Sequence, residues 1–428
     1  MWRAVLADID PRQLLLSIYR KALAAVEGGH AVERWLRTHP PDTGPWHLVA
    51  VGKAAEAMTI GALAVLGDAV HSGLVITKSG HLSGALGNDG RFAMMYAEHP
   101  WPGEGSLQAG DALLDFIETA PVDGRLLFLI SGGASSLVEV PVAGVDLAFL
   151  RRATDWLLAS GQPIDEVNRV RQRLSRIKGG GLRRQLGGRD ALALVVSDVP
   201  GDDPRAIGSG LLAEPLPGSV GGLPDWLAER LASTPADLAG LPAVPHYLVA
   251  SLQHALDAAR RAALETGYPV SMWPHLLAGD AGLAGREIAT SLRHAPPGFL
   301  IGGGETTVML PDAPGHGGRN QHFALAAATV LDGQDDCWLL AAGTDGTDGP
   351  TSDAGALVDG GSIERGCAGG LDPDVALERA DAGSFLAVSG DLISTGPTGT
   401  NVMDLVIGLC VGSVMPANAG SDQKESVE

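Results

Sequence analysis

The chain has 428 residues, of which 45% are hydrophobic, so it is long enough to form two domains with separate cores. Its formal net charge of −20 argues against nucleic acid and anionic membrane surfaces as partners, because both reward broad basic patches. No apolar run is long enough to span a membrane, and the cysteines form no C-x-x-C pair, which indicates a reduced, cytoplasmic protein without a disulfide framework or zinc knuckle.

Short apolar runs recur along the chain, each followed by a glycine-bearing turn and a helical pattern. They cover residues 47–51, 73–77, 126–130, 191–197, 247–250, 299–301 and 337–342. This rhythm predicts βα units, and therefore an α/β fold with a mostly parallel sheet and helices on both faces. Ligands of such folds bind at the carboxyl ends of the strands, so the loops that follow these runs are the candidate sites.

A stretch rich in proline and glycine over residues 214–245 predicts the junction between two domains. We expect an N-terminal domain over residues 1–243 and a C-terminal domain over residues 244–415, with a cleft between them. The βα unit that starts at Tyr247 opens the second domain in this prediction. Residues 416–428 are small, polar and acidic, which is typical of a disordered tail.

Two loops in the first half of the chain are candidate anion sites. Lys53 directly follows the run at 47–51 and starts a predicted helix, where backbone N–H groups favour an anion. This loop is not a Walker A loop, and an exposed lysine at a helix start is the alternative. The loop after residues 126–130 predicts an anion nest, with a bare βα turn as the alternative. The nest residues assigned to nucleotide binding are Ser131, Gly132, Gly133, Ser135 and Ser136.

A cluster of cations surrounds three glycines in residues 168–184, which is unusual in so acidic a chain. Most charge clusters are solvated helix faces, and several of these arginines fit that description. Arg171 and Lys178 are two helical turns apart, so they share one face and are able to point at one carboxylate or phosphate. We assign Lys178 to nucleotide binding.

Aspartates follow two of the predicted strands. Asp198 ends the run at 191–197, and Asp345 and Asp348 follow the run at 337–342. An aspartate at a strand end suits either Mg²⁺ or the proton of a substrate hydroxyl, while turn formation is the alternative. We predict Asp198, Asp345 and Asp348 as metal ligands.

Further loops combine glycine with polar side chains. Arg319 follows two glycines, which suits a guanidinium that must reach phosphate oxygens as a fork. The segment 394–401 is too poor in packing side chains to be a core element, so it is either a phosphate or ribose cradle or a decorated hairpin turn. The residues assigned here to nucleotide binding are Gly303, Gly304, Glu305, Thr306, Gly396, Thr398, Gly399, Thr400 and Asn401.

Together these loops supply cations, glycine nests and aspartates at strand ends, which is the inventory for phosphoryl transfer by positioning and electrostatic stabilisation. The ordered motifs GKAAEAM, SGGASSL, SDVPGD, GGGETTV, GGRNQ, GTDGTDGPT and TGPTGTNV resemble those of the glycerate 2-kinases of the MOFRL type.

The resemblance implies two α/β/α domains, the first of them Rossmann-like, closing over ATP–Mg²⁺ and D-glycerate to give 2-phosphoglycerate and ADP. It also implies catalytic roles for Lys53, Asp198, Arg319 and Asp345. A monomer or homodimer is expected.

Three alternatives stay open. Similar proteins are often called hydroxypyruvate reductases, but this chain has no convincing dinucleotide fingerprint, because Gly208-Ser209-Gly210 follows a loop rather than a strand. Ser209-Gly210-Leu211 also replaces the usual S-G-P, which leaves open a kinase for another small hydroxy acid. A non-catalytic metabolite-binding protein on the same fold is the third alternative.

Overall fold

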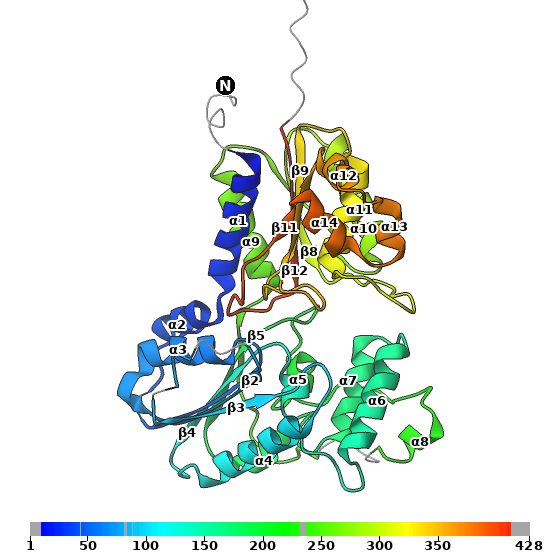
Figure 1. Cartoon of the computed structure of the whole chain (residues 1–428). Helices are drawn as coiled ribbons and strands as arrows, with labels where there is room; N and C mark the ends of the chain where they lie inside the picture. Colours follow the sequence, from blue (N-terminus) through cyan, green and yellow to red (C-terminus); the bar gives the residue numbers. More distant parts are fainter. Residues whose placement is uncertain (1–9, 43, 81–83, 88, 232–236, 412–428) are drawn as a thin grey trace, which may run out of the picture.

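The computed structural model describes residues 10–42, 44–80, 84–87, 89–231 and 237–411. It has two lobes, each built around a six-stranded sheet, so the predicted α/β class is confirmed (Figure 1). The predicted tail at 416–428 lies outside the described residues. Within the described residues, no helix is both long enough and apolar enough to cross a membrane.

The first sheet is entirely parallel and has the strand order β3-β2-β1-β4-β5-β6. This is the order of doubly wound dinucleotide-binding folds. Its strands are β1 (Trp46–Val51), β2 (Val70–Lys78), β3 (Phe92–Ala97), β4 (Arg125–Ile130), β5 (Ala191–Val196) and β6 (His246–Ala250). Side chains of β4 alternate between two cores, with Leu127 and Leu129 on one face and Leu126 and Phe128 on the other. Both faces are therefore buried, as the continuous apolar runs predict.

Helices cover both faces of the first sheet. The face of Leu127 packs with α2 (Gly28–Thr38) and α3 (Ala55–Leu66), and the opposite face packs with α4 (Glu104–Thr119). Beside this sheet, a group of helices has an apolar cluster of its own (Figure 1). It consists of α6 (Leu147–Ala159), α7 (Ile164–Leu174) and α8 (Asp225–Ala228), next to the short helix α5 (Ala134–Leu137).

The second sheet has the order β11-β10-β9-β12-β8-β7, and only its β7–β8 pair is parallel. The prediction of a mostly parallel sheet therefore holds for the first sheet and is wrong for the second. The loop between β9 and β10 contains no crossover helix, which a parallel connection would need. The strands are β7 (Val270–Met272), β8 (Gly298–Gly304), β9 (Cys337–Gly343), β10 (Gly355–Asp359), β11 (Leu392–Ile393) and β12 (Asp404–Cys410).

The second sheet is also sandwiched between helices, so each lobe has three layers. One face packs against α1 (Pro11–Val26) and α9 (Leu252–Leu264), and the other against α10 (Ala281–His294) and α11 (Arg319–Leu331). The remaining helices of this lobe are α12 (Ser362–Ala368), α13 (Pro373–Glu378) and α14 (Ala382–Ser389).

Two segments belong to the lobe opposite to the one predicted. The run that was expected to open the second domain forms β6, which pairs with β5 in the first sheet. The N-terminal helix α1 buries Leu15, Ile18 and Tyr19 against the second lobe rather than the first. Helix α1 is amphipathic, and its apolar face is able to pack against either sheet, so sequence alone does not select the partner. The chain therefore crosses between the lobes after α1 and again after β6.

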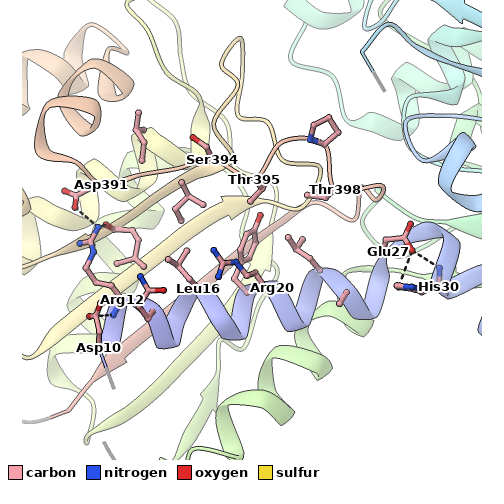
Figure 2. Close-up of a pocket in the computed structure, with 18 residues that line it drawn as sticks. Asp10, Arg12, Leu16, Arg20, Glu27, His30, Asp391, Ser394, Thr395 and Thr398 are labelled. Atoms are coloured by element: carbon pink, nitrogen blue, oxygen red, sulfur yellow. Dashed lines mark hydrogen bonds and ion pairs between the residues drawn. The ribbon is translucent and has the colours of Figure 1, made fainter. Parts of the chain in front are cut away.

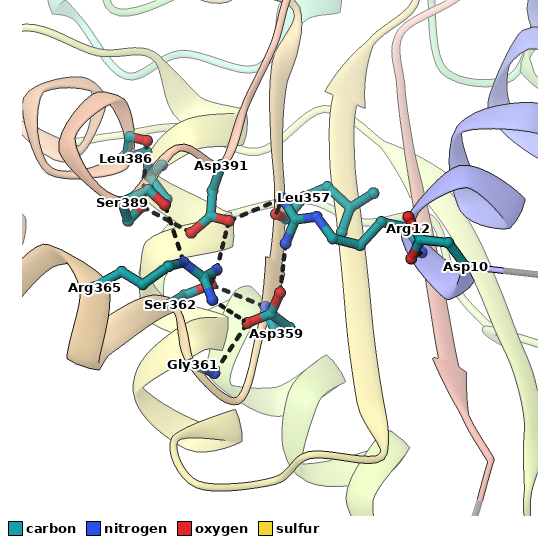
Figure 3. Close-up of polar contacts among 10 residues, drawn as sticks. All are labelled: Asp10, Arg12, Leu357, Asp359, Gly361, Ser362, Arg365, Leu386, Ser389 and Asp391. Atoms are coloured by element: carbon teal, nitrogen blue, oxygen red, sulfur yellow. Dashed lines mark hydrogen bonds and ion pairs between the residues drawn. The ribbon is translucent and has the colours of Figure 1, made fainter.

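An ion-pair network anchors α1 to the second lobe (Figure 3). The Arg12 guanidinium lies 2.5 Å from Asp359 and 2.9 Å from Asp391, and it also donates to the Leu357 carbonyl. Arg365 contacts the same two carboxylates from the other side. Asp391 is buried, so its charge depends on both arginines.

Arg12→Met is expected to lower the free energy of unfolding by about 1–2 kcal/mol, because the buried Asp391 loses one of its two cations. Urea unfolding followed by circular dichroism measures this change. Arg20→Met is the matched control, since Arg20 lies on the same helix and is exposed; a change within about 0.5 kcal/mol is expected there. Equal effects of the two substitutions would contradict the anchoring role of Arg12.

The cysteines depart from the sequence analysis. Cys337 and Cys410 face each other on β9 and β12 and form a disulfide, whereas no disulfide was expected. The two residues are 73 positions apart, and only the pairing of these strands brings them together. Cys367 is free and exposed.

Candidate functional site

Two polar contacts join the strand ends of the first sheet to loops of the second. The Lys53 ammonium lies 2.7 Å from Asp345 Oδ2, and the Asn401 amide nitrogen lies 3.3 Å from Asp198 Oδ2. Lys53 follows β1, Asp198 follows β5, and Asp345 follows β9. The structure thus brings three of the four predicted catalytic residues into one site between the lobes.

The position directly before Lys53 has room for glycine only. Gly52 has φ +133°, and a Cβ there would lie 2.1 Å from the Ser131 hydroxyl oxygen. The same hydroxyl accepts the Ala54 N–H at 3.0 Å, and the Lys53 N–H donates to the Gly132 carbonyl at 2.9 Å. Ser131, which was assigned to nucleotide binding, is fully buried and holds the loops after β1 and β4 together.

Gly132 lies where three loops converge. A Cβ on Gly132 would lie 2.2 Å from Asp198 Oδ2 and 2.6 Å from the Asn401 amide nitrogen. Any side chain at this position would therefore push Asp198 and Asn401 apart. In the predicted nest, the backbone of Gly132 therefore lies in close contact with Asn401 from the loop of the other lobe.

The two aspartates beside Lys53 have opposite pKa shifts. Burial raises the pKa of Asp198 to about 6, and Lys53 only partly opposes this rise. Burial would also raise the pKa of Asp345, but Lys53 and the hydrogen bonds from Thr347 outweigh it and hold that pKa below its usual range. Asp198 is therefore the better proton acceptor, while Asp345 remains an anion.

Arg319 lies in the same site and forms ion pairs with two carboxylates. Its Nε and Nη2 atoms donate to Asp404 at 2.6 and 3.1 Å, and Nη1 donates to Glu305 at 2.5 Å. The surrounding protein partly desolvates the Glu305 carboxylate and raises its pKa, although the side chain is 43% exposed, while Arg319 lowers that pKa. Asp404 pairs with Gly343 of β9, two residues before Asp345, so the contact of Arg319 with Asp404 and that of Lys53 with Asp345 lie at the same end of the second sheet.

Asp404 is the site residue that the sequence analysis missed. It is buried at the first position of β12, next to Gly304 of β8 and Gly343 of β9. Its only sequence signal is an aspartate at the head of an apolar run, directly after the segment 394–401.

Asp348 caps helix α11, while its predicted metal ligation stays a prediction. Its Oδ1 atom accepts the backbone N–H of Asn320 at 3.0 Å, and Oδ2 accepts that of Gln321 at 2.8 Å. Both oxygens are thus committed to the first turn of α11, where N–H groups have no partner within the helix. Asp348 therefore positions Arg319, the first residue of this helix.

Burial raises the pKa of Asp348 to about 7, although the Asn320 and Gln321 N–H groups oppose it. Because the folded-state pKa lies above the unfolded value, this group contributes stability that is lost as the pH rises through about 7. Asp348→Asn removes this titrating carboxyl. Its free energy of unfolding should therefore decline less steeply than that of the wild type between pH 5.5 and pH 8. Urea titrations in EDTA test this, and parallel pH profiles of the two proteins would contradict it.

The other predicted nucleotide residues fall into two groups. Gly303 and Gly304 are strand residues, because β8 pairs them with Leu405 and Asp404, so their backbone is committed to the sheet. The segment 394–401 contacts both lobes instead: the Thr398 hydroxyl donates to the Thr344 carbonyl, and the Gly399 carbonyl accepts the Gly28 N–H at 3.0 Å. Thr306 and Thr400 are buried, while Glu305 and Gly396 are exposed.

A groove of about 660 Å³ runs between α1 and the segment 392–398 (Figure 2). Leu16 and Leu23 line it from α1, and Thr395 and Thr398 line it from the opposite side. The segment 394–401 therefore borders this groove at one end and reaches Asp198 through Asn401 at the other.

Within the described residues, no group of three His, Cys, Asp or Glu side chains forms a ready metal site. The fold and the site define an α/β enzyme with two cations and several carboxylates at facing strand ends, an arrangement suited to phosphoryl transfer.

Comparisons with known proteins give the family. Residues 14–216 match a domain of unknown function (DUF4147), and residues 298–404 match the MOFRL family. D-glycerate 2-kinase of Thermotoga maritima is 38% identical over 94% of this chain and 98% of its own. The crystal structure of a glycerate kinase from the same organism has a TM-score of 0.81 and 37% identity, covering 94% of this chain and 99% of that one. A relative from Agrobacterium vitis, 37% identical over 93% of this chain and 94% of its own, carries the name of a hydroxypyruvate reductase.

The chain belongs to the glycerate 2-kinase family of the MOFRL type. The predicted family is thereby confirmed. The functional roles of individual residues stay predictions.

Proposed function

We propose that the protein transfers the γ-phosphoryl group of ATP to the 2-hydroxyl of D-glycerate, giving 2-phosphoglycerate and ADP. The observation that carries this proposal is the meeting of Lys53, Asp198 and Asp345 at facing strand ends, with Arg319 at the start of α11 bound to Asp404 at the same end of the second sheet. The kinase names of the relatives support it, and the missing dinucleotide fingerprint disfavours the reductase.

In this proposal Asp198 accepts the proton of the 2-hydroxyl, and the freed oxygen attacks the γ-phosphorus. The bond from that phosphorus to the bridging oxygen of ADP breaks, and ADP leaves. Lys53 and Arg319 stabilise the charge on the transferring group, since cations held in place beforehand need no reorganisation during the reaction. A raised pKa suits Asp198 to proton transfer near neutral pH.

Mg²⁺ is usually held in kinases by one or two carboxylates together with substrate phosphates. Asp198 and Asp345 are the carboxylates that would hold it, because Asp345 contacts Lys53 and Asp198 lies against Gly132, whose carbonyl accepts the Lys53 N–H. When bound, the ion would neutralise charge on the β- and γ-phosphates. A cytoplasmic location and a monomeric or homodimeric state stay predictions from the sequence.

Incubation with ATP, Mg²⁺ and D-glycerate, followed by enolase, tests the proposal. Enolase acts directly on 2-phosphoglycerate, so formation of phosphoenolpyruvate without a mutase identifies the 2-phosphate. A second sample with hydroxypyruvate and NADH or NADPH, without ATP, tests the reductase. Cofactor oxidation in the second sample and no ADP in the first would overturn the proposal.

A further inference from the structure

Asn401 connects the second lobe to the carboxylate of Asp198. Its amide nitrogen donates to Asp198 Oδ2 at 3.3 Å, and the two groups lie directly over Gly132, where any side chain would separate them. Among the residues that the structure describes, no other side chain donates a hydrogen bond to this carboxylate. Asp198 belongs to the first lobe, so its side-chain donor comes from the opposite lobe.

Thr344 holds the chain on both sides of Asn401. The carbonyl of Thr344 accepts the Thr398 hydroxyl at 2.5 Å, three residues before Asn401. The Thr344 hydroxyl accepts the Val402 N–H at 2.8 Å and donates to the Met403 carbonyl at 2.6 Å, directly after Asn401. Thr344 is only 1% exposed, so water does not compete for these hydrogen bonds.

The backbone that follows Asn401 has a conformation that needs such support. Met403 has φ +72°, a left-handed value that is unfavourable for a residue other than glycine unless its surroundings hold it. The hydroxyl and the N–H of Thr344 both donate to the Met403 carbonyl, at 2.6 and 3.0 Å. Met403 directly precedes Asp404, the first residue of β12. Thr344 therefore fixes the direction in which the chain leaves Asn401 and enters the sheet.

We propose that Asn401 is a positioning residue, which fixes the rotation of the Asp198 carboxylate so that Oδ1 receives the proton of the 2-hydroxyl, and that Thr344 holds Asn401 in place for this task. This inference rests on the proposed function and deepens it. The role differs from the nucleotide contact that the sequence predicts for Asn401. Because the orienting amide belongs to the second lobe, Asp198 is oriented in this way only while the two lobes are in contact.

Asn401→Ala tests the first half of the proposal, with steady-state kinetics over D-glycerate and over ATP. The kcat should fall on the order of 10- to 100-fold, because a misdirected proton acceptor makes the reactive geometry rare. Both KM values should stay close to those of the wild type, since Asn401 contacts neither substrate in this proposal. A raised KM for ATP with an unchanged kcat would show that Asn401 binds the nucleotide, and would overturn the proposal.

Thr344→Val and Thr344→Ser test the second half. Valine keeps the shape of threonine and removes the hydroxyl, so the kcat should fall as in Asn401→Ala. Serine keeps the hydroxyl and should restore most of the wild-type kcat. The control is Thr59→Val, since Thr59 is also buried and its hydroxyl donates to the Ala55 carbonyl within its own helix. With all variants shown to be folded by circular dichroism, equal losses in the two valine variants would overturn the role of Thr344.

The double variant Asn401→Ala/Thr344→Val tests whether the two residues act together. Its loss of kcat should be smaller than the product of the two single losses, because both substitutions release the same carboxylate. Losses that multiply would show that Thr344 acts independently of Asn401. If Thr344→Val does not fold, Asn401→Ala still decides the proposal, because Asn401 is only half-buried.

Hydrogen exchange measured by mass spectrometry separates this inference from the proposed function, since it needs no turnover. Residues 398–404 should exchange faster in Thr344→Val than in the wild type, and Thr59→Val should leave their exchange unchanged. If the wild type phosphorylates no D-glycerate, the proposed function fails, while this measurement still decides whether Thr344 fixes the segment. Unchanged exchange in Thr344→Val would show that it does not.

Discussion

Lys53→Met is expected to lower kcat for D-glycerate phosphorylation on the order of 10³-fold, since the substitution removes a cation from the transferring phosphoryl group. Methionine keeps the length of the side chain, which is only 15% exposed, so the loop after β1 should keep its shape. ADP release in a coupled assay measures the effect, and circular dichroism checks the fold.

Lys21→Met is the control for this substitution. Lys21 lies on α1 and forms an exposed ion pair with Glu265 at 2.7 Å, away from the strand ends. Exposed pairs of this kind contribute little to stability, so wild-type turnover is expected. A folded Lys53→Met protein with near-normal turnover would exclude Lys53 from the reaction.

The sequence predicted the buried strands of the first sheet well, because a strand covered on both faces is a continuous apolar run. The runs at 126–130 and 191–197 correspond to β4 and β5 within one residue. It missed β3, an edge strand whose residues are mostly half-exposed, since partial burial leaves no such run. It also missed β12, which is buried throughout but directly follows a loop without strand signals.

The pairing of strands that are far apart in the chain was not predictable from the sequence, for a different reason. Strand runs indicate that a sheet forms, but not which strand returns to its centre. β12 is the last strand of the described residues and still lies between β8 and β9, and this insertion makes the second sheet antiparallel there. The pairing of Tyr19 with the Gly343 carbonyl, 324 positions away, likewise depends on which sheet α1 covers.

The residues of the candidate site also divide into those that local sequence pattern predicts and those whose role depends on long-range contacts. Lys53, Asp198, Arg319 and Asp345 each follow a glycine or a strand end, so residue type and local pattern were enough to select them. Asp404 lies 85 positions from Arg319, and its importance comes from the contact alone. The same holds for Asp348, whose role as a cap for α11 depends on a loop that folds back onto the helix.

Arg319→Met is expected to lower kcat on the order of 10³-fold, and Arg319→Lys should recover little of that loss. The guanidinium donates in parallel to both oxygens of Asp404 and also to Glu305, and an ammonium does not reproduce that fork. Initial rates at saturating ATP and D-glycerate measure the loss. The substitution also leaves the buried Asp404 without its cation, so the unfolding free energy should fall by about 1–3 kcal/mol.

Arg365→Met separates these two effects. Arg365 also bridges two aspartates in the same lobe, Asp359 and Asp391, from α12 on the side opposite Arg12 (Figure 3). Asp359 pairs with Trp338 near the start of β9, at the end of that strand opposite to Asp345. This variant should lose a comparable amount of stability and still keep wild-type kcat at a temperature where it is folded. If both arginine variants lose turnover only in proportion to their unfolded fraction, then Arg319 stabilises the lobe and does not act on the phosphoryl group.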